Sequence, residues 1–330
     1  MTDPRSQAPR QKLPRFALDG VLLLDKPLGL SSNDALIKAK RLLQALKAGH
    51  TGTLDPLATG LLPLCFGEAT KFSQDLLEAD KTYEAHVRLG ETTTTGDAEG
   101  EVLQTRPVTV DDAAIRAILP RFMGRISQVP PMYSALKRDG KPLYEYARAG
   151  QTLEREAREV TIHALALTQS ALPHTNEFTF RVTCSKGTYV RTLAEDIGEA
   201  LGCGAHLRGL RRTAVGPLTL DGAVTLEDLS ALDHAQRVAK LAPVDALLKT
   251  LPAIMLDETL ARRFSHGQRL RLDEIRCPTP LRAYAAAHGE IEVKVYTEAT
   301  SEATSRLLGV ARLDGEALLT PQRLLKTQSS

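Results

Sequence analysis

The stretch from Gly49 to Gly60, Gly-His-Thr-Gly-Thr-Leu-Asp-Pro-Leu-Ala-Thr-Gly, most constrains what this chain can fold into. Three glycines, three threonines and a single acid, Asp55, fall within these twelve residues. Glycine allows positive φ and close backbone approach, so the stretch predicts a shaped loop that holds Asp55 toward a ligand. Local physics offers a second interpretation, because Asp-Pro is a common helix opening and Asp55 would then cap a helix over Leu57–Leu62. The two roles do not exclude each other.

Four further motifs lie before and after this stretch. They are Asp25-Lys26-Pro27-Leu28-Gly29, Lys81-Thr82-Tyr83, Ser185-Lys186-Gly187-Thr188-Tyr189-Val190-Arg191-Thr192 and Leu210-Arg211-Arg212. Together with residues 49–56, this ordered set resembles the TruB-type tRNA pseudouridine synthases, from about residue 20 to the C-terminus. The resemblance implies an isomerase that converts a uridine of tRNA to pseudouridine, namely uridine 55 of the T loop in tRNA numbering.

The chain has 330 residues, which is enough for a sizeable core and two domains. Its four cysteines (Cys65, Cys184, Cys203 and Cys277) lie far apart without a C-x-x-C pair. This spacing argues against a zinc site or a disulfide framework and indicates a reducing compartment. No apolar run approaches a membrane span, and the N-terminus lacks the apolar region of a signal peptide. We therefore expect a cytoplasmic protein with no membrane contact and no metal.

Basic residues cluster, although the net charge is only +2. The range Met132–Arg158 combines six basic and four acidic residues with Tyr133, Tyr144 and Tyr146. A mobile basic arm with aromatic side chains can grip RNA by phosphate contact and stacking. An ordinary amphipathic excursion would have the same composition. The resemblance favours the first interpretation, because the family has an RNA-gripping insertion here, at about residues 130–158.

Apolar periodicity predicts the elements of a first domain. Alternating or short apolar runs predict strands, and helical spacing after capping residues predicts helices. The predicted strands are 20–24, 83–89, 178–184 and 207–214, and the predicted helices are 34–47, 110–119 and 188–201. Residues 92–101 are typical of a hairpin tip. Residues 1–18, rich in Pro, Gln and Arg, predict a disordered tail.

A change in the sequence pattern near Leu241–Leu251 indicates a second domain. Asp257 can cap a short helix, residues 291–296 alternate, and apolar runs 307–313 and 316–319 flank Asp314-Gly315, a strong two-residue hairpin signal. This predicts a small β-rich domain, similar in place to the PUA domain of the family. We therefore predict a tail over 1–18, a catalytic domain over 19–250 and a PUA-like RNA-binding domain over 251–330. The predicted fold class is α+β, with a mixed, largely antiparallel sheet and flanking helices in the catalytic domain.

The implied reaction cleaves the C1′–N1 glycosidic bond, rotates the freed base and rejoins it through C5. A single carboxylate can act as the nucleophile, and the resemblance assigns that role to Asp55. The sequence leaves open whether Asp55 attacks the base, attacks C1′ or removes a ribose proton. We expect no cofactor.

Two further residues match catalytic positions of the family. The target base must leave the RNA stack, and the resemblance assigns a stacking face to Tyr83, whose phenol could also relay a proton. Arg191 falls in the first turn of a predicted helix, where a cation gains nothing from the helix dipole. The resemblance pairs it with Asp55, where a guanidinium would hold the carboxylate ionised and aimed. By pattern alone Tyr83 could be a core residue of a strand, and Arg191 could serve a phosphate or a surface salt bridge.

Four more residues match family positions around the uridine. The resemblance places His50 beside the flipped nucleotide, and Tyr189 and Leu210 in the lining of the uridine pocket. It places Lys26 near the site, with a structural role rather than a chemical one. By pattern alone, a lone histidine is more often structural and Leu210 resembles a core residue.

Three other functions fit parts of the sequence. Residues 49–52 could form the phosphate nest of a nucleotide-dependent enzyme, but the chain lacks both the Gly-Lys-Ser/Thr ending and G-x-G-x-x-G. A noncatalytic RNA-binding protein would not need a carboxylate facing phosphate. An enzyme of the guide-RNA-dependent branch would not need its own gripping arm. We therefore expect a stand-alone enzyme that binds the T stem-loop of tRNA without a guide RNA or an obligate protein partner.

Overall fold

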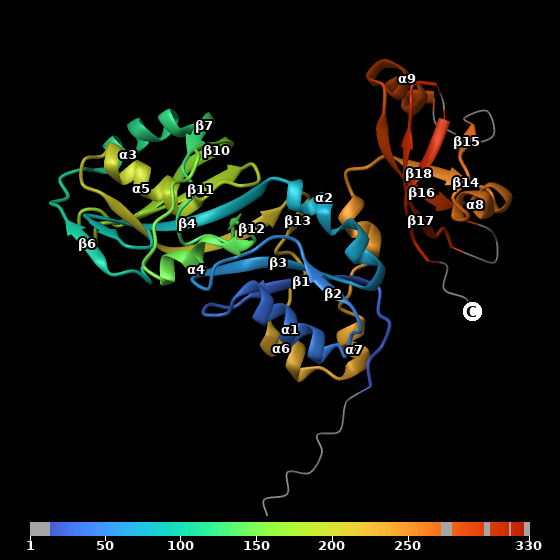
Figure 1. Ribbon diagram of the computed structural model, residues 1–330, viewed down its shortest axis with the longest axis horizontal. Coiled ribbons are helices and arrows are strands. Elements are labelled where there is room, and N and C mark those ends of the chain that lie inside the picture. Colours follow the sequence, from blue (N-terminus) through green and yellow to red (C-terminus); the bar gives the residue numbers. More distant parts are fainter. Residues whose placement is uncertain (1–13, 272–278, 300–303, 317, 327–330) are drawn as a thin grey trace, which may run out of the picture.

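The computed structural model describes residues 14–271, 279–299, 304–316 and 318–326, arranged around two main sheets (Figure 1). The helices are α1 Ser32–Leu42, α2 Ser73–Glu78, α3 Asp112–Ile118, α4 Leu143–Arg148, α5 Val190–Ala200, α6 Leu226–Ala231, α7 His234–Val238, α8 Glu258–Ser265 and α9 Thr279–His288, with 3-10 helices η1 Gly67–Phe72, η2 Leu119–Phe122 and η3 Val244–Leu248. The strands are β1 Gly20–Lys26, β2 Ala48–His50, β3 Ala58–Phe66, β4 Lys81–Leu89, β5 Glu91–Thr93, β6 Val102–Thr105, β7 Gly124–Gln128, β8 Lys137–Arg138, β9 Lys141–Pro142, β10 Arg158–Ser170, β11 Glu177–Cys184, β12 Ala205–Val215, β13 Leu218–Thr219, β14 Ala253–Leu256, β15 Leu270–Arg271, β16 Ile291–Thr297, β17 Leu307–Leu313 and β18 Leu318–Leu324.

The larger sheet has the strand order β1-β3-β12-β4-β11-β10-β7, with β2 on β3 and β13 on β12. Its β3–β12 pair is parallel, and the other described pairs are antiparallel. This confirms the predicted mixed, largely antiparallel sheet. Helix α5 packs over the half that contains β4 and β11, while α1 and α6 pack over β1 and β3 (Figure 1).

The helix expected over Leu57–Leu62 is wrong, because residues 58–62 belong to strand β3. Strand β3 lies between β1 and β12 and is covered on both faces, with Leu62 and Leu64 in one apolar cluster and Leu61 and Cys65 in another. A strand buried on both faces has a continuous apolar run, which periodicity cannot distinguish from a buried helix. The Asp-Pro capping signal is local, and burial in the sheet outweighs it.

The first predicted helix is shorter than expected, and the predicted tail ends earlier. Helix α1 is capped by Ser31, whose side chain accepts a hydrogen bond from Asp34, and it ends at Leu42 rather than Lys47. Gln44 has a φ of 50°, and its carbonyl accepts a hydrogen bond from the Phe16 backbone. Residues 1–13 of the tail lie outside the described residues, but Phe16 pairs with the segment after α1.

The second sheet has the order β14-β16-β17-β18-β15 and confirms a β-rich C-terminal region. Asp257 caps α8 as expected, since its side chain accepts a hydrogen bond from Leu260. The loop between β17 and β18 is longer than the expected two-residue turn, because Leu313 pairs with Leu319. The side chain of Asp314 accepts backbone hydrogen bonds within this loop and stabilises its wider form.

No helix within the described ranges is both long and apolar enough to cross a lipid bilayer.

Candidate active site

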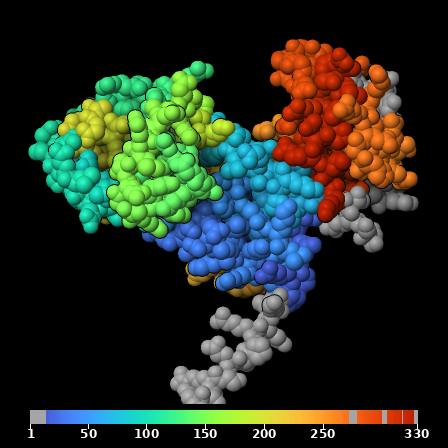
Figure 2. Space-filling model, in the orientation of Figure 1, coloured from blue at the N-terminus to red at the C-terminus, as the bar shows by residue number. Residues whose placement is uncertain are grey.

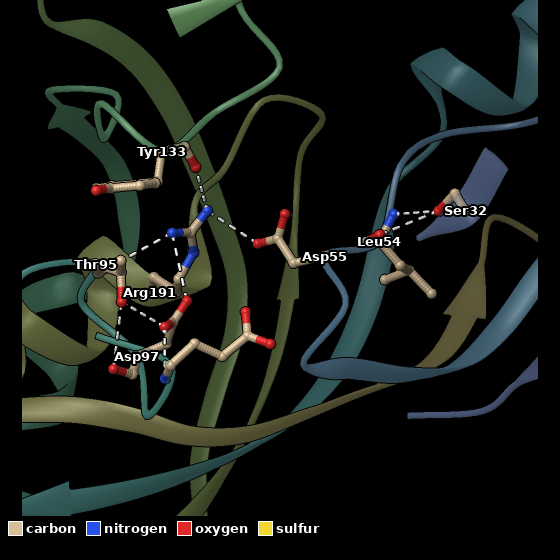
Figure 3. A network of polar contacts seen from close by, with 8 residues as sticks. Ser32, Leu54, Asp55, Thr95, Asp97, Tyr133 and Arg191 are labelled. Carbon is tan, nitrogen blue, oxygen red and sulfur yellow. Dashed lines mark hydrogen bonds and ion pairs between the residues drawn. The ribbon is translucent and has the colours of Figure 1, made fainter. Parts of the chain in front are cut away.

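The loop that carries Asp55 is fixed on both sides by hydrogen bonds, of which Figure 3 shows those between Ser32 and Leu54. The Leu54 N–H donates to Ser32 Oγ at 2.7 Å, and the Ser32 hydroxyl donates to the Leu54 carbonyl at 3.2 Å. On the other side, the Ala58 N–H donates to the Asp55 carbonyl at 3.0 Å. The Asp55 carboxylate itself stays 43% exposed, so the loop presents it outward, as the glycine spacing predicts.

Glycine is required where this loop enters the sheet. Gly60 has a φ of 97°, and a Cβ added there would lie 2.3 Å from the carbonyl oxygen of Arg212. The parallel neighbour β12 therefore approaches β3 at a distance that only glycine permits. Gly52 also has a positive φ, 108°, in the approach to Asp55.

Arg191 contacts Asp55 and three other oxygens with its terminal nitrogens (Figure 3). Its Nη2 lies 2.9 Å from Asp55 Oδ2 and donates to the Tyr133 carbonyl at 2.6 Å. Its Nη1 donates to the Thr95 carbonyl at 3.0 Å and lies 3.5 Å from Asp97 Oδ2. The expected pair with Asp55 is therefore present, through Nη2. The remaining contacts tie the guanidinium to the β5–β6 segment and to the start of the arm.

Asp97 is a buried carboxylate that sequence reasoning missed. It is 3% exposed, and its Oδ1 accepts hydrogen bonds from the Thr95 hydroxyl at 2.5 Å and from the Glu99 N–H at 3.1 Å. These contacts hold its other oxygen toward Arg191. The sequence offered only one indication of its role, an acidic residue within the segment 92–101, and that segment was interpreted only as a hairpin tip.

A cavity of about 300 Å³ opens beside the Asp55–Arg191 pair. Five of the predicted site residues line it, namely Asp55, Tyr83, Tyr189, Arg191 and Leu210. The arm contributes Ser134 and Ala135, α2 contributes Leu77, and the β11–α5 connection contributes residues 185–188. The cavity thus collects residues from segments that are far apart in the chain, and Asp55 and Arg191 lie on its wall.

Tyr83 on β4 is half-buried and lines this cavity. Burial raises the pKa of its phenol, and the nearby charge of Arg212 opposes that rise. A raised pKa keeps the phenol protonated at neutral pH. Tyr83 therefore offers an aromatic face and a hydrogen-bond donor rather than a base.

Tyr189 and Arg191 are positioned by the start of α5. The Gln128 side chain, from the end of β7, binds Tyr189 twice: its Oε1 accepts from the Tyr189 N–H at 3.1 Å, and its Nε2 donates to the Tyr189 carbonyl at 3.3 Å. Gln128 is 2% exposed, so this clamp is buried. It fixes the first turn of α5, from which Arg191 reaches Asp55.

His50 and Lys26 do not line the cavity. His50 ends β2 and pairs with Leu64, and burial lowers its pKa. Lys26 is buried, and its Nζ donates to the carbonyls of Pro27 at 3.0 Å and Leu30 at 2.5 Å, which closes the turn after β1. Burial lowers its pKa to about 8, with the charge of Asp55 acting in the opposite direction. The contacts of Lys26 are those of a structural residue.

Arg212 and Lys81 are two cations that line the cavity. Both belong to motifs noted in the sequence, but the sequence assigned no function to either. Arg212 is 1% exposed, and its Nε donates to the Leu61 carbonyl at 2.8 Å. Its Nη2 has no hydrogen-bond partner among the described residues. Strand alternation was the available signal, because Leu210 and Arg212 face the cavity while Arg211 between them pairs with Asp25. Burial lowers the pKa of Lys81 to about 8.

Metal ligation has no support in the described part of the chain, where no group of three or more His, Cys, Asp or Glu is placed to hold an ion. Cys65, Cys184 and Cys203 are buried free thiols, and Cys277 lies outside the described residues.

Three family models match the chain consecutively. The model described as "TruB family pseudouridylate synthase (N terminal domain)" matches residues 40–190. "tRNA pseudouridylate synthase B C-terminal domain" matches 191–251, and "Pseudouridine synthase II TruB, C-terminal" matches 252–325. The last boundary agrees with the start of the C-terminal sheet.

Proteins named tRNA pseudouridine synthase B are similar over nearly the whole chain. That of Burkholderia mallei (strain ATCC 23344) is 69% identical over 97% of this chain and 98% of its own length. That of Cupriavidus taiwanensis is 64% identical over 99% of this chain and 100% of its own length. Among solved structures, a Cbf5-Nop10-Gar1 complex has a chain with a TM-score of 0.68 at 24% identity, covering 93% of this chain and 85% of that one. At this identity the likeness concerns the fold.

Proposed function

This chain belongs to the TruB family of tRNA pseudouridine synthases, and we propose that it isomerises uridine 55 of the T loop (tRNA numbering). The Asp55–Arg191 ion pair, 2.9 Å long on the wall of a cavity, is the observation that carries the proposed site. It supports a carboxylate that the guanidinium aims at the place where a uridine would bind.

We assign the nucleophilic role to Asp55. In the reaction the C1′–N1 bond breaks, the C1′–C5 bond forms, the proton on C5 leaves and N1 gains a proton. Substrate and product have the same composition, so the reaction consumes neither an oxidant nor a cofactor. Three first steps are open to Asp55: attack on the base, attack on C1′ and removal of a ribose proton.

The remaining cavity residues bind and orient the base in this proposal. The target uridine flips out of the RNA, because the reacting atoms of a stacked base are out of reach of Asp55. Tyr83 stacks on the flipped base, Tyr189 and Leu210 contact it, and Arg191 holds Asp55. His50 lies outside the cavity wall, which fits contact with the RNA around the flipped nucleotide rather than with the base itself.

We propose that the enzyme grips tRNA directly, without a guide RNA or an obligate protein partner, and acts in the cytoplasm. Two features support direct binding. The insertion at about residues 130–158 carries cations next to aromatic rings, with Lys141 Nζ 4.7 Å from the ring centroid of Tyr146. The second feature is the separate five-stranded sheet β14-β16-β17-β18-β15, which supports our proposal of a PUA-like RNA-binding domain over residues 251–330.

The decisive experiment is site mapping. The protein is incubated with unmodified tRNA, and pseudouridine is located position by position. Modification at uridine 55 alone, lost in Asp55→Asn, is the expected result. Modification only in the presence of a second RNA would contradict the guide-free proposal, and modification at another position would overturn the target.

A further inference from the structure

Helix α2 contributes to the lining of the active-site cavity and contacts the C-terminal domain. In Figure 1 it lies on the side of the larger sheet that faces the C-terminal domain, and Figure 2 shows the light-blue part of the chain packed against that red and orange domain. The helix has only six residues, and they contact both the cavity lining and the C-terminal domain. Leu77 lines the cavity, and Glu78 forms an ion pair with Lys186, another cavity-lining residue. Asp75 faces the C-terminal domain instead.

The C-terminal domain contacts α2 and the preceding η1 mainly through strand β18. Arg323 Nη1 lies 2.8 Å from Asp75 Oδ1, and its guanidinium lies 5.4 Å from the ring centroid of Phe72. Lys71 Nζ donates to the Leu324 carbonyl at 2.7 Å. These polar contacts surround an apolar cluster that contains Val310 of the C-terminal domain together with Phe72 and Leu76. The two parts of the chain therefore share a packed, ion-paired interface at α2.

Direct contacts also connect α2 to the residues that line the cavity. Lys81, which lines the cavity, donates from Nζ to the Leu77 carbonyl at 2.7 Å. Leu77 also lies near the loop before Asp55, since a Cβ added to Gly52 would be 3.8 Å from Leu77 Cδ2. A displacement of α2 would therefore move Leu77 and the Glu78–Lys186 pair on the cavity rim.

From these contacts we infer that Arg323 of the C-terminal domain and Asp75 of α2 are positioning residues for the isomerisation. Docking of β18 sets the place of α2, and α2 sets the shape of the cavity rim where the RNA enters. The C-terminal domain thus contributes to the rate of the chemical step as well as to RNA binding. This inference rests on the proposed catalysis at Asp55, but it does not depend on which uridine is the target.

The opposite charges of Arg323 and Asp75 allow a positioning role to be distinguished from direct RNA binding, because the two side chains would affect RNA binding in opposite ways. An RNA phosphate can bind Arg323 but is repelled by Asp75. We would compare full-length Arg323→Met, Asp75→Asn and the double variant, measuring the single-turnover rate at saturating unmodified tRNA and the Kd separately. Arg312→Met is the matched control, because it removes the same charge from the same domain, where Arg312 pairs at 3.1 Å with Glu290 away from α2.

The expected result is a single-turnover rate about 3- to 30-fold lower in each single variant, with Kd changed less than about twofold. The double variant should be no slower than the slower single variant, because either substitution already breaks the contact. Arg312→Met should keep the wild-type rate. If Arg323→Met does not fold, the isosteric Asp75→Asn carries the test alone.

Two results would overturn the inference. Weaker tRNA binding in Arg323→Met with an unchanged rate in Asp75→Asn would make Arg323 a phosphate contact. Wild-type rates in both variants would make the interface purely structural. Failure of the proposed catalysis is distinguishable from either result, because it would show as activity retained by Asp55→Asn in the same assay.

Discussion

Arg191 Nη2 lies 2.9 Å from Asp55 Oδ2, although Asp55 lies in the loop before β3 and Arg191 in helix α5, so the two residues meet only in the folded chain. The arginine is 7% exposed in the first turn of α5, where the helix dipole opposes a cation by about 0.3–1 kcal/mol. Asp55 and the buried Asp97 offset that cost. The guanidinium is consequently held by groups that also define the cavity.

Asp55→Asn should abolish pseudouridine formation while folding and tRNA binding survive. The substitution keeps the size of the side chain and removes its charge, and Arg191 retains Asp97 as a partner. Single-turnover kinetics with saturating tRNA measure the effect. A retained rate above about a tenth of wild type, only ~1.4 kcal/mol of barrier, would show that the carboxylate is not essential.

Arg191→Lys should lower the single-turnover rate at least about tenfold, because one ammonium cannot replace two nitrogens that contact Asp55 and two backbone carbonyls. Arg191→Met should in addition lower the free energy of unfolding by about 3–5 kcal/mol, because it leaves Asp97 buried and unpaired. Denaturant unfolding of Arg191→Met with and without Asp97→Asn checks the cause. Equal stability of these two variants would mean that Asp97 is not the source of the loss.

Binding of tRNA should weaken steeply with salt, with a log–log slope of several units, because phosphate contacts dominate affinity. Neutralising Lys137, Arg138 and Lys141 to Gln should reduce that slope by about 2 if these arm residues contact phosphate. Filter binding across a salt series measures both values. A flat salt response would contradict an electrostatic grip, and an unchanged slope in the variant would place the contacts elsewhere.

The free energy of unfolding should fall as pH rises from about 5 to about 8, and Glu195 should account for part of the fall. Burial raises the pKa of Glu195 from 4.5 to about 7, and neighbouring Asp196 adds to the rise. Between pH 4.5 and about pH 7, the folded state therefore binds more protons than the unfolded state. The free energy of unfolding falls over this range as the Glu195 carboxyl ionises in the folded protein. After allowance for partial exposure, we expect a loss of about 1–2 kcal/mol that Glu195→Gln removes. A difference between wild type and variant that does not change with pH would refute this.

Gly60→Ala should destabilise the protein by at least about 2 kcal/mol, because positive φ strain adds to a backbone collision with Arg212. Gly140→Ala is the matched control. Its φ of 79° is also positive, but an added Cβ would meet nothing within 4 Å. Denaturant unfolding should therefore show a clearly larger loss at Gly60, and equal losses would mean that the close approach to β12 contributes nothing.

A truncation near Leu251 would not separate binding from catalysis. Leu247 and Leu248 before the cut share an apolar cluster with Val310 after it. Removing the C-terminal domain would expose this cluster to water and disturb α2 as well. Point variants at the interface are therefore the sharper test.

Local signals in the sequence determined much of the fold. Alternation predicted β4, β11 and β16, and the cap at Asp257 predicted α8, because strand pleating and helix capping depend on neighbours in the chain. The sequence also predicted strands at β12 and, beside the Asp314-Gly315 turn signal, at β17. The motifs identified the family and named five of the residues that line the cavity. These features depend on residue types at fixed short spacings.

Tertiary structure decided those features that depend on contacts between distant parts of the chain. It made residues 58–66 a strand, because β1 and β12 pair with its two edges and apolar clusters cover its two faces. It ended α1 early, where the Gln44 carbonyl accepts a hydrogen bond from Phe16. It also placed Asp97 and Arg212 in the site and left His50 and Lys26 outside the cavity wall. Each of these outcomes depends on contacts between residues far apart in the chain, which come into being only when the sheet is assembled.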